Sequence, residues 1–305
     1  WVAPLSLDSR KGRIGAVALL VFAFVVLFAA VQSLRVLSSD MFVNRAAALY
    51  NETQDFSRAS ASVSTALAIH SKNDRAHRAA VELGLLQLVR LSAAGDASEE
   101  ARAQLQNTLT STIQHGVAAV EIEGGDYQNW LSLARLYGEL AGAGVEGAVQ
   151  IARSAYEAAR SNNPTNPIPL LGLAQIDLVE ANDAAAREHL AAALAIKPDF
   201  EAALFLLSQI DARTNNLPAA RASAELVVRA APDDPLGWYN LGTIYYAQKE
   251  YENAAASFER AAGIENNYAN ARFLLSASYA ALGRFEDAVV ALRAVAALNP
   301  DNATL

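Results

Sequence analysis

The sequence of 305 residues contains no cysteine, which excludes disulfides, thiolate-ligated zinc, iron–sulfur clusters and cysteine nucleophiles. Proline and glycine are scarce, with 9 and 16 copies, whereas alanine is abundant. Because helix breakers are few, the composition predicts an all-helical protein. The formal net charge of −8 argues against a nucleic-acid partner, since an acidic surface repels phosphate groups.

The sequence also lacks the motifs that usually carry chemistry. It has no nucleophile elbow, no P-loop and no dinucleotide-binding glycine motif, and its histidines do not show the spacing of metal ligands. We therefore predict no catalytic residue, no metal site and no cofactor, and we expect that the chain is not an enzyme. Because the chain begins with Trp1 and its only methionine is Met41, we expect a processed chain or a fragment.

One uninterrupted apolar run lies near the N-terminus. Residues 14–34 contain no charge, and 21 helical residues at about 1.5 Å each span a hydrocarbon core of about 30 Å. The run predicts a transmembrane helix, which residues 35–39 join to the rest of the chain without a flexible linker. Its alternatives are a buried core helix and a cleaved signal peptide; the length of the run and the missing small-x-small site disfavour cleavage.

The charges around this run predict its orientation. Residues 1–13 form a basic flank with Arg10, Lys11 and Arg13, and the positive-inside rule places such a flank in the cytoplasm. We therefore expect a single-pass membrane protein whose remaining residues lie outside the cytoplasm.

A 34-residue pattern repeats through the second half of the chain. In residues 235–268, small residues stand at positions 8, 20 and 27 of the unit, and large residues at positions 4, 7, 11 and 24. Two antiparallel helices can cross closely with this pattern, because small side chains let the backbones approach and large ones fill the surrounding space. The same register continues through 167–200, 201–234 and 269–302, which predicts four consecutive helical hairpins.

This pattern resembles the tetratricopeptide repeat, whose consensus positions are occupied here by Trp238, Leu241, Gly242, Tyr245, Ala254, Phe258 and Ala261. The resemblance implies an all-α fold in which one transmembrane helix precedes a right-handed superhelical solenoid of antiparallel helix hairpins. Residues 127–166 match a further unit, if glycine-rich residues 141–148 lengthen its turn. Five repeats then span residues 127–302.

Residues 40–126 fit the repeat less closely. Residues 40–73 match a degenerate first unit, and the remainder is interpreted as an enlarged hairpin with a second helix from about Glu99 to Val120. We therefore expect degenerate or enlarged hairpins throughout this region.

The resemblance also implies a binding surface. In the tetratricopeptide family, the first helix of each hairpin lines the concave face of the array and holds a peptide. Carried over position by position, this gives a protein-binding surface of Leu171, Gln175, Leu178, Phe205, Gln209, Tyr239, Asn240, Thr243, Tyr246 and Phe273. Its aromatic and amide side chains predict a partner with apolar side chains. Alternatively, Phe205 and Phe273 pack between neighbouring hairpins.

Two functions fit these features. The first is a membrane-tethered scaffold that mediates protein–protein interaction at the membrane surface, of the kind found in bacterial envelope assembly. The second is the C-terminal repeat tail of a polytopic glycan polymerase or ligase that resembles O-antigen ligases, with its catalytic part before Trp1. Self-association is a further possibility, because residues 303–305 are too few to form a helix that caps the last hairpin.

Overall fold

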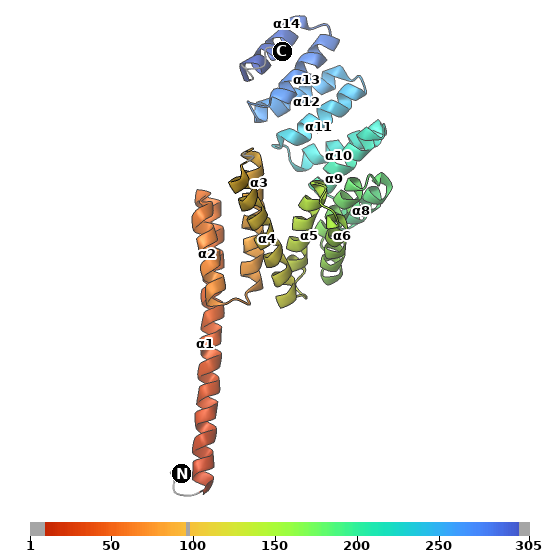
Figure 1. Cartoon of the computed structure of the whole chain (residues 1–305). Helices are drawn as coiled ribbons and strands as arrows, with labels where there is room; N and C mark the ends of the chain where they lie inside the picture. The colour runs from red at the N-terminus through yellow and green to blue at the C-terminus, as the bar shows by residue number, and fades with distance from the viewer. Residues whose placement is uncertain (1–9, 96–97, 299–305) are drawn as a thin grey trace, which may run out of the picture. The chain divides into compact units, whose positions relative to one another are not determined.

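The computed structural model describes residues 10–95 and 98–298, with side chains from Val17 onward. Within these ranges the chain forms fourteen α-helices and no strand, which confirms the predicted all-α class. The chain divides into two compact units, Trp1–Asn162 and Asn163–Leu305 (Figure 1). Most of the predicted basic flank and the last four residues of the predicted final repeat lie outside the described residues, as do residues 303–305.

The first unit consists of six helices. Each helix packs against the next one along the chain, and α3 also contacts α1 and α5. Their bounds are α1 Arg10–Thr53, α2 Phe56–Ile69, α3 Asp74–Ala93, α4 Glu99–Ile122, α5 Tyr127–Gly142 and α6 Ala148–Asn162.

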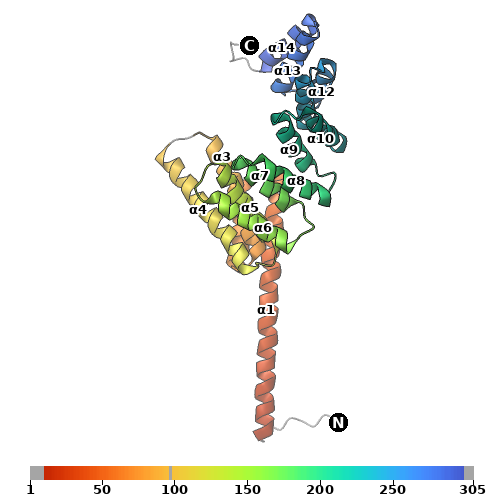
Figure 2. The same cartoon turned by 90° about the vertical axis from the view of Figure 1, so that its right-hand side faces the viewer.

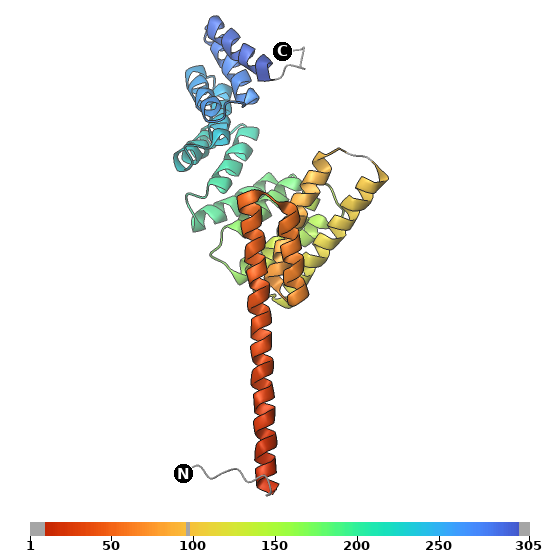
Figure 3. The same ribbon diagram turned by 90° about the vertical axis from the view of Figure 1, so that its left-hand side faces the viewer.

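Helix α1 has 44 residues and two different surroundings. Its apolar first half stands clear of α2–α6 in every view of this unit (Figures 1, 2 and 3). Residues from Ser39 onward pack against α2 and α3, and Val43 and Ala46 are buried there. The helix continues through residues 35–39 because no proline or glycine interrupts it between Ala16 and Thr53.

The exposed half of α1 has the length and composition of a membrane span. Within Val17–Thr53, the most apolar window has a mean hydropathy of 2.6, and none of it is buried. Large side chains here are open to the surroundings, with Leu20 at 71% and Phe24 at 69% exposure. Of the described helices, α1 alone is long and apolar enough to cross a membrane.

Hydrogen bonds fix the second half of α1 to the hairpin that follows. The Ser39 hydroxyl donates to the Ala66 carbonyl at 2.8 Å, and the Asn73 amide donates to Ser39 Oγ at 2.7 Å. All three residues are buried. One continuous helix therefore belongs both to the candidate membrane span and to the packed core of the first unit.

The second unit, as far as residue 298, consists of eight helices in four antiparallel hairpins. Each helix packs against the next, and first helices also contact one another, as α9 and α13 both do with α11. The bounds are α7 Ile168–Val179, α8 Asp183–Ile196, α9 Glu201–Arg213, α10 Leu217–Ala230, α11 Pro235–Ala247, α12 Tyr251–Ile264, α13 Ala269–Ala281 and α14 Phe285–Leu298.

The backbone repeats every 34 residues in this unit. The turn inside each hairpin contains one residue in the left-handed region, with φ between 58° and 74°, at Ala181, Asn215, Lys249 and Gly283. Glycine and asparagine adopt this conformation readily, whereas it costs alanine and lysine about 1–2 kcal/mol. At Ala181 and Lys249 the turn is therefore imposed by the packing of the two helices.

Candidate functional site

The predicted binding residues of the second unit lie on the first helices of its hairpins but differ in exposure. Phe273 is 47% exposed, and the Gln175 and Gln209 side chains are also open to solvent. A second group is half-buried and presents only part of each side chain; its members are Leu171, Leu178, Phe205, Tyr239, Thr243 and Tyr246. The exposed aromatic ring and the two exposed amides are therefore the side chains that a partner reaches most easily.

Two of the predicted aromatic residues take part in packing between helices. The Tyr239 ring lies 5.9 Å from the Phe258 ring and 5.2 Å from the Tyr268 ring, measured between centroids. The Tyr246 ring meets Tyr251 edge-on at 5.3 Å. Replacing either tyrosine by alanine would therefore weaken the hairpin, which makes both poor positions for testing partner binding alone.

Asn240 requires a correction to the predicted surface. Its side chain is 8% exposed, and its amide donates to Ser208 Oγ at 2.7 Å. Ser208 belongs to α9, so this hydrogen bond ties the first helices of two successive hairpins together. Asn240 is a buried structural residue and not part of an exposed row, because its position in α11 faces the preceding hairpin.

Charged side chains of the second unit form hydrogen bonds between successive hairpins. Arg221 Nε donates to Glu225 Oε1 at 2.7 Å, and Arg221 Nη1 donates to Glu250 at 3.0 Å. The hydrogen bond from Arg221 lowers the pKa of Glu225. The Tyr245 hydroxyl donates to Glu225 at 3.2 Å, and burial raises the pKa of Tyr245. The Glu225 carboxylate is therefore ionised at neutral pH. The same contacts link α10 to Tyr245 of α11 and to Glu250 at the start of α12.

The first unit contains a leucine-lined groove that the sequence did not reveal. It has a volume of about 810 Å³ and lies between α3, α4 and α5. Val89 is 66% exposed there. The apolar lining residues are Leu85, Leu86, Leu88, Val89, Leu105, Leu109, Leu136 and Leu140.

The groove has a polar edge. Arg135 Nη1 lies 2.9 Å from Glu82 Oε1, and Glu139 lies on the same side of α5 as Arg135. The sequence predicted an enlarged hairpin in this region but no groove, because a groove depends on how three helices are placed in space. Exposed apolar surface of this extent is a common feature of interaction sites.

Two histidines of the first unit share a hydrogen bond. His77 Nδ1 and His115 Nδ1 lie 2.9 Å apart, and His77 Nε2 lies 3.0 Å from the Ser71 carbonyl. The carbonyl can only accept, so His77 Nε2 carries a proton, and in the neutral pair His115 Nδ1 donates to His77. Burial and His77 lower the pKa of His115, which is therefore neutral at pH 7. Its Nε2 remains free as an acceptor.

Among the residues that the structure describes, no three histidine, aspartate or glutamate side chains lie close enough together to hold a metal ion.

Comparisons with known proteins agree with the repeat geometry. Residues 205–269 and residues 245–305 each match a family model described as tetratricopeptide repeat. No curated protein matches the chain.

Several solved structures share the fold at low sequence identity. A structure of Cut9–Hcn1 from the APC/C has a TM-score of 0.60 at 16% identity over 87% of this chain, which spans 47% of that one. Pseudomonas aeruginosa pilF gives 0.56 at 16% identity, over 75% of this chain and 94% of that one. YrrB, a repeat protein with an unusual peptide-binding site, gives 0.50 at 16% identity, over 61% of this chain and 93% of that one.

These likenesses show the fold, and the family models place the repeats. Tetratricopeptide arrays are typically scaffolds for protein–protein interaction rather than enzymes. The hairpins, their 34-residue register and the two family matches lead to one conclusion. Residues 205–305 of the chain are tetratricopeptide repeats.

Proposed function

We propose that the chain is a membrane-tethered scaffold whose repeats bind a protein partner close to the bilayer. The observation that carries this proposal is the continuity of α1, which runs from an exposed apolar segment into the packed first unit without a break. Because no flexible linker separates the apolar segment from the first hairpin, that hairpin is held close to the membrane. The proposed setting is the bacterial envelope, with the repeats outside the cytoplasm.

The proposed partner is a protein segment with apolar side chains that lies along α9, α11 and α13. Phe273 supplies an exposed aromatic ring, and Gln209 supplies an amide that can pair with a peptide backbone. A few aromatic contacts usually carry most of the affinity of such an interface. The repeats keep the same binding role if the chain is the tail of a polytopic glycan polymerase.

Photo-crosslinking from position 273 tests the proposed surface. With benzoylphenylalanine in place of Phe273, the full chain in native membranes should form one discrete adduct with another protein. Phe273 is exposed and its replacement keeps an aromatic ring, so the fold is not disturbed. The adduct should be identified by mass spectrometry.

The matched control places the same crosslinker at Glu252, which is exposed on the second helix α12. The proposal expects no discrete adduct from this position, and loss of the adduct at 273 when Gln209→Ala is added. Equal adducts from both positions, or none from either, would overturn the assignment of the surface.

A further inference from the structure

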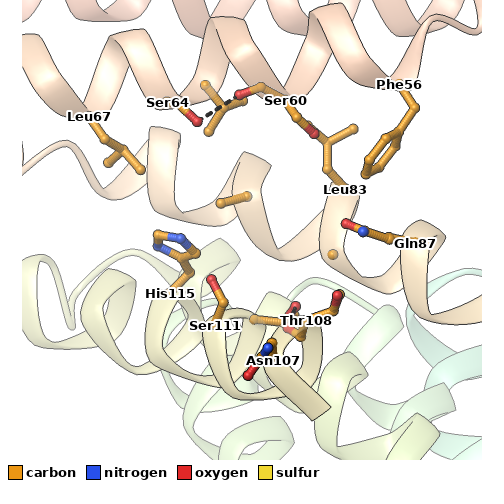
Figure 4. A pocket seen from close by; sticks show the side chains of 14 residues that line it. Phe56, Ser60, Ser64, Leu67, Leu83, Gln87, Asn107, Thr108, Ser111 and His115 are labelled. Atoms are coloured by element: carbon orange, nitrogen blue, oxygen red, sulfur yellow. Dashed lines mark hydrogen bonds between the residues drawn. The ribbon is translucent and has the colours of Figure 1, made fainter. Parts of the chain in front are cut away.

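A second cavity of the first unit lies between α2, α3 and α4 and differs from the leucine-lined groove in its chemistry. Its volume is about 340 Å³. Figure 4 shows Ser60, Ser64 and Leu67 of α2 along one side, with Ser111 and His115 of α4 across from them. Its lining combines serine, threonine, asparagine and glutamine side chains with leucine, valine and phenylalanine, which suits a ligand that has both kinds of surface.

The polar groups in this cavity are mostly without protein partners. Ser64 donates to the Ser60 carbonyl at 3.0 Å, and Thr112 donates to the Thr108 carbonyl at 2.7 Å. No described residue hydrogen-bonds the side chains of Ser60, Gln87, Asn107, Thr108 or Ser111. The free Nε2 of His115 belongs to the same set. Six uncharged side chains in the lining of this cavity therefore have donors or acceptors that no described residue uses.

The absence of charge from this lining selects the class of ligand. None of the lining residues is aspartate, glutamate, lysine or arginine, so a charged ligand would lose hydration without gaining a counter-ion there. Arg90 lies outside the lining, with its guanidinium 6.0 Å from the centroid of the Phe56 ring. The Phe56 ring adds an apolar surface on which the C–H face of a sugar ring can stack.

The length of the cavity favours a compact ligand over a peptide. The lining residues of α4 run from Asn107 to His115, which at 1.5 Å per residue is about 12 Å. An extended peptide advances about 3.3 Å per residue, so only three or four residues fit this length. Two linked sugar rings present many more hydroxyl groups over the same distance, which matches the density of free donors and acceptors.

We infer that the cavity between α2, α3 and α4 is a binding site for a neutral saccharide of about two rings. In this site Gln87, Asn107 and Ser111 hydrogen-bond sugar hydroxyls, and Phe56 stacks against a ring. The site lies in the first unit, whereas the proposed protein-binding surface lies in the second, so each can fail without the other.

Saturation-transfer NMR and calorimetry on the full chain in lipid nanodiscs test this inference. The probes are maltose, lactose and N,N′-diacetylchitobiose, with a neutral, acetylated and amidated tetrapeptide of glycine, serine and asparagine as the competing class. At least one disaccharide should receive saturation, and Gln87→Leu should weaken its binding about tenfold, as loss of one buried hydrogen bond implies. Phe56→Leu should also weaken it.

The matched control is Gln106→Leu, which makes the same change on an exposed part of α4 that does not line the cavity. This variant should bind the disaccharide as the unaltered chain does, and helix content should be equal in all variants. The inference is overturned if no disaccharide binds, if the peptide binds instead, or if Gln87→Leu and Gln106→Leu have equal effects.

Discussion

Arginine at positions 24 and 28 should release the chain from membranes that otherwise retain it. Phe24 and Phe28 lie one turn apart in the exposed half of α1, with ring centroids 6.5 Å from each other. Each arginine near the centre of a membrane helix costs about 2.5–3.5 kcal/mol, so the pair should shift insertion by about 10⁴-fold. Extraction of isolated membranes with alkaline carbonate measures the result for Phe24→Arg/Phe28→Arg.

The matched control adds the same charges to the same helix with the same spacing. Leu37 and Met41 are 61% and 71% exposed but lie beyond the predicted span, so Leu37→Arg/Met41→Arg should remain in the membrane fraction. If the unaltered chain is extracted by carbonate, or if both double variants behave alike, α1 is not a membrane span.

Gly242→Val should destabilise the α11–α12 hairpin by about 3 kcal/mol, the upper part of the range for overpacked cores. A Cβ at this position would lie 2.7 Å and 2.8 Å from two ring carbons of Phe258. Phe258 is fully buried, so its ring cannot move aside without displacing the core. The loss of stability should appear as faster hydrogen exchange of the α11 and α12 backbone amides, measured by mass spectrometry.

Gly263 provides the control for this substitution. It lies in α12, and no atom lies within 4 Å of a Cβ added there, so Gly263→Val should leave stability nearly unchanged. Equal exchange rates in both variants would show that close approach at position 242 does not hold the hairpin together.

The repeating hairpins were predictable because their causes are local and periodic. Small residues such as Gly242 and Ala254 mark where two helices cross, and the pattern recurs at a constant spacing along the chain. The start of α4 was also readable: Glu99 follows Ser98, whose side chain accepts a hydrogen bond from the Ala101 amide at 3.1 Å. Serine before an acidic first turn is a common helix start.

The details of the candidate sites were not predictable from the same pattern. Asn240 occupies a position that the repeat assigns near the concave face, but its partner Ser208 comes from another hairpin. Tyr239 is likewise drawn into packing by Phe258 and Tyr268. The leucine-lined groove and the cavity between α2, α3 and α4 are each lined by residues of three helices. Sequence periodicity carries no information about how three helices are placed in space.

Cysteine labelling tests most directly whether α1 crosses a membrane and holds the repeats outside the cytoplasm. The chain has no cysteine, so Ser6→Cys and Glu52→Cys each introduce one unique thiol, before and after the apolar segment. In cells whose cytoplasmic membrane is sealed, an impermeant maleimide should label position 52 and should label position 6 only after lysis. Labelling of both positions, of neither, or of position 6 alone before lysis would contradict the account.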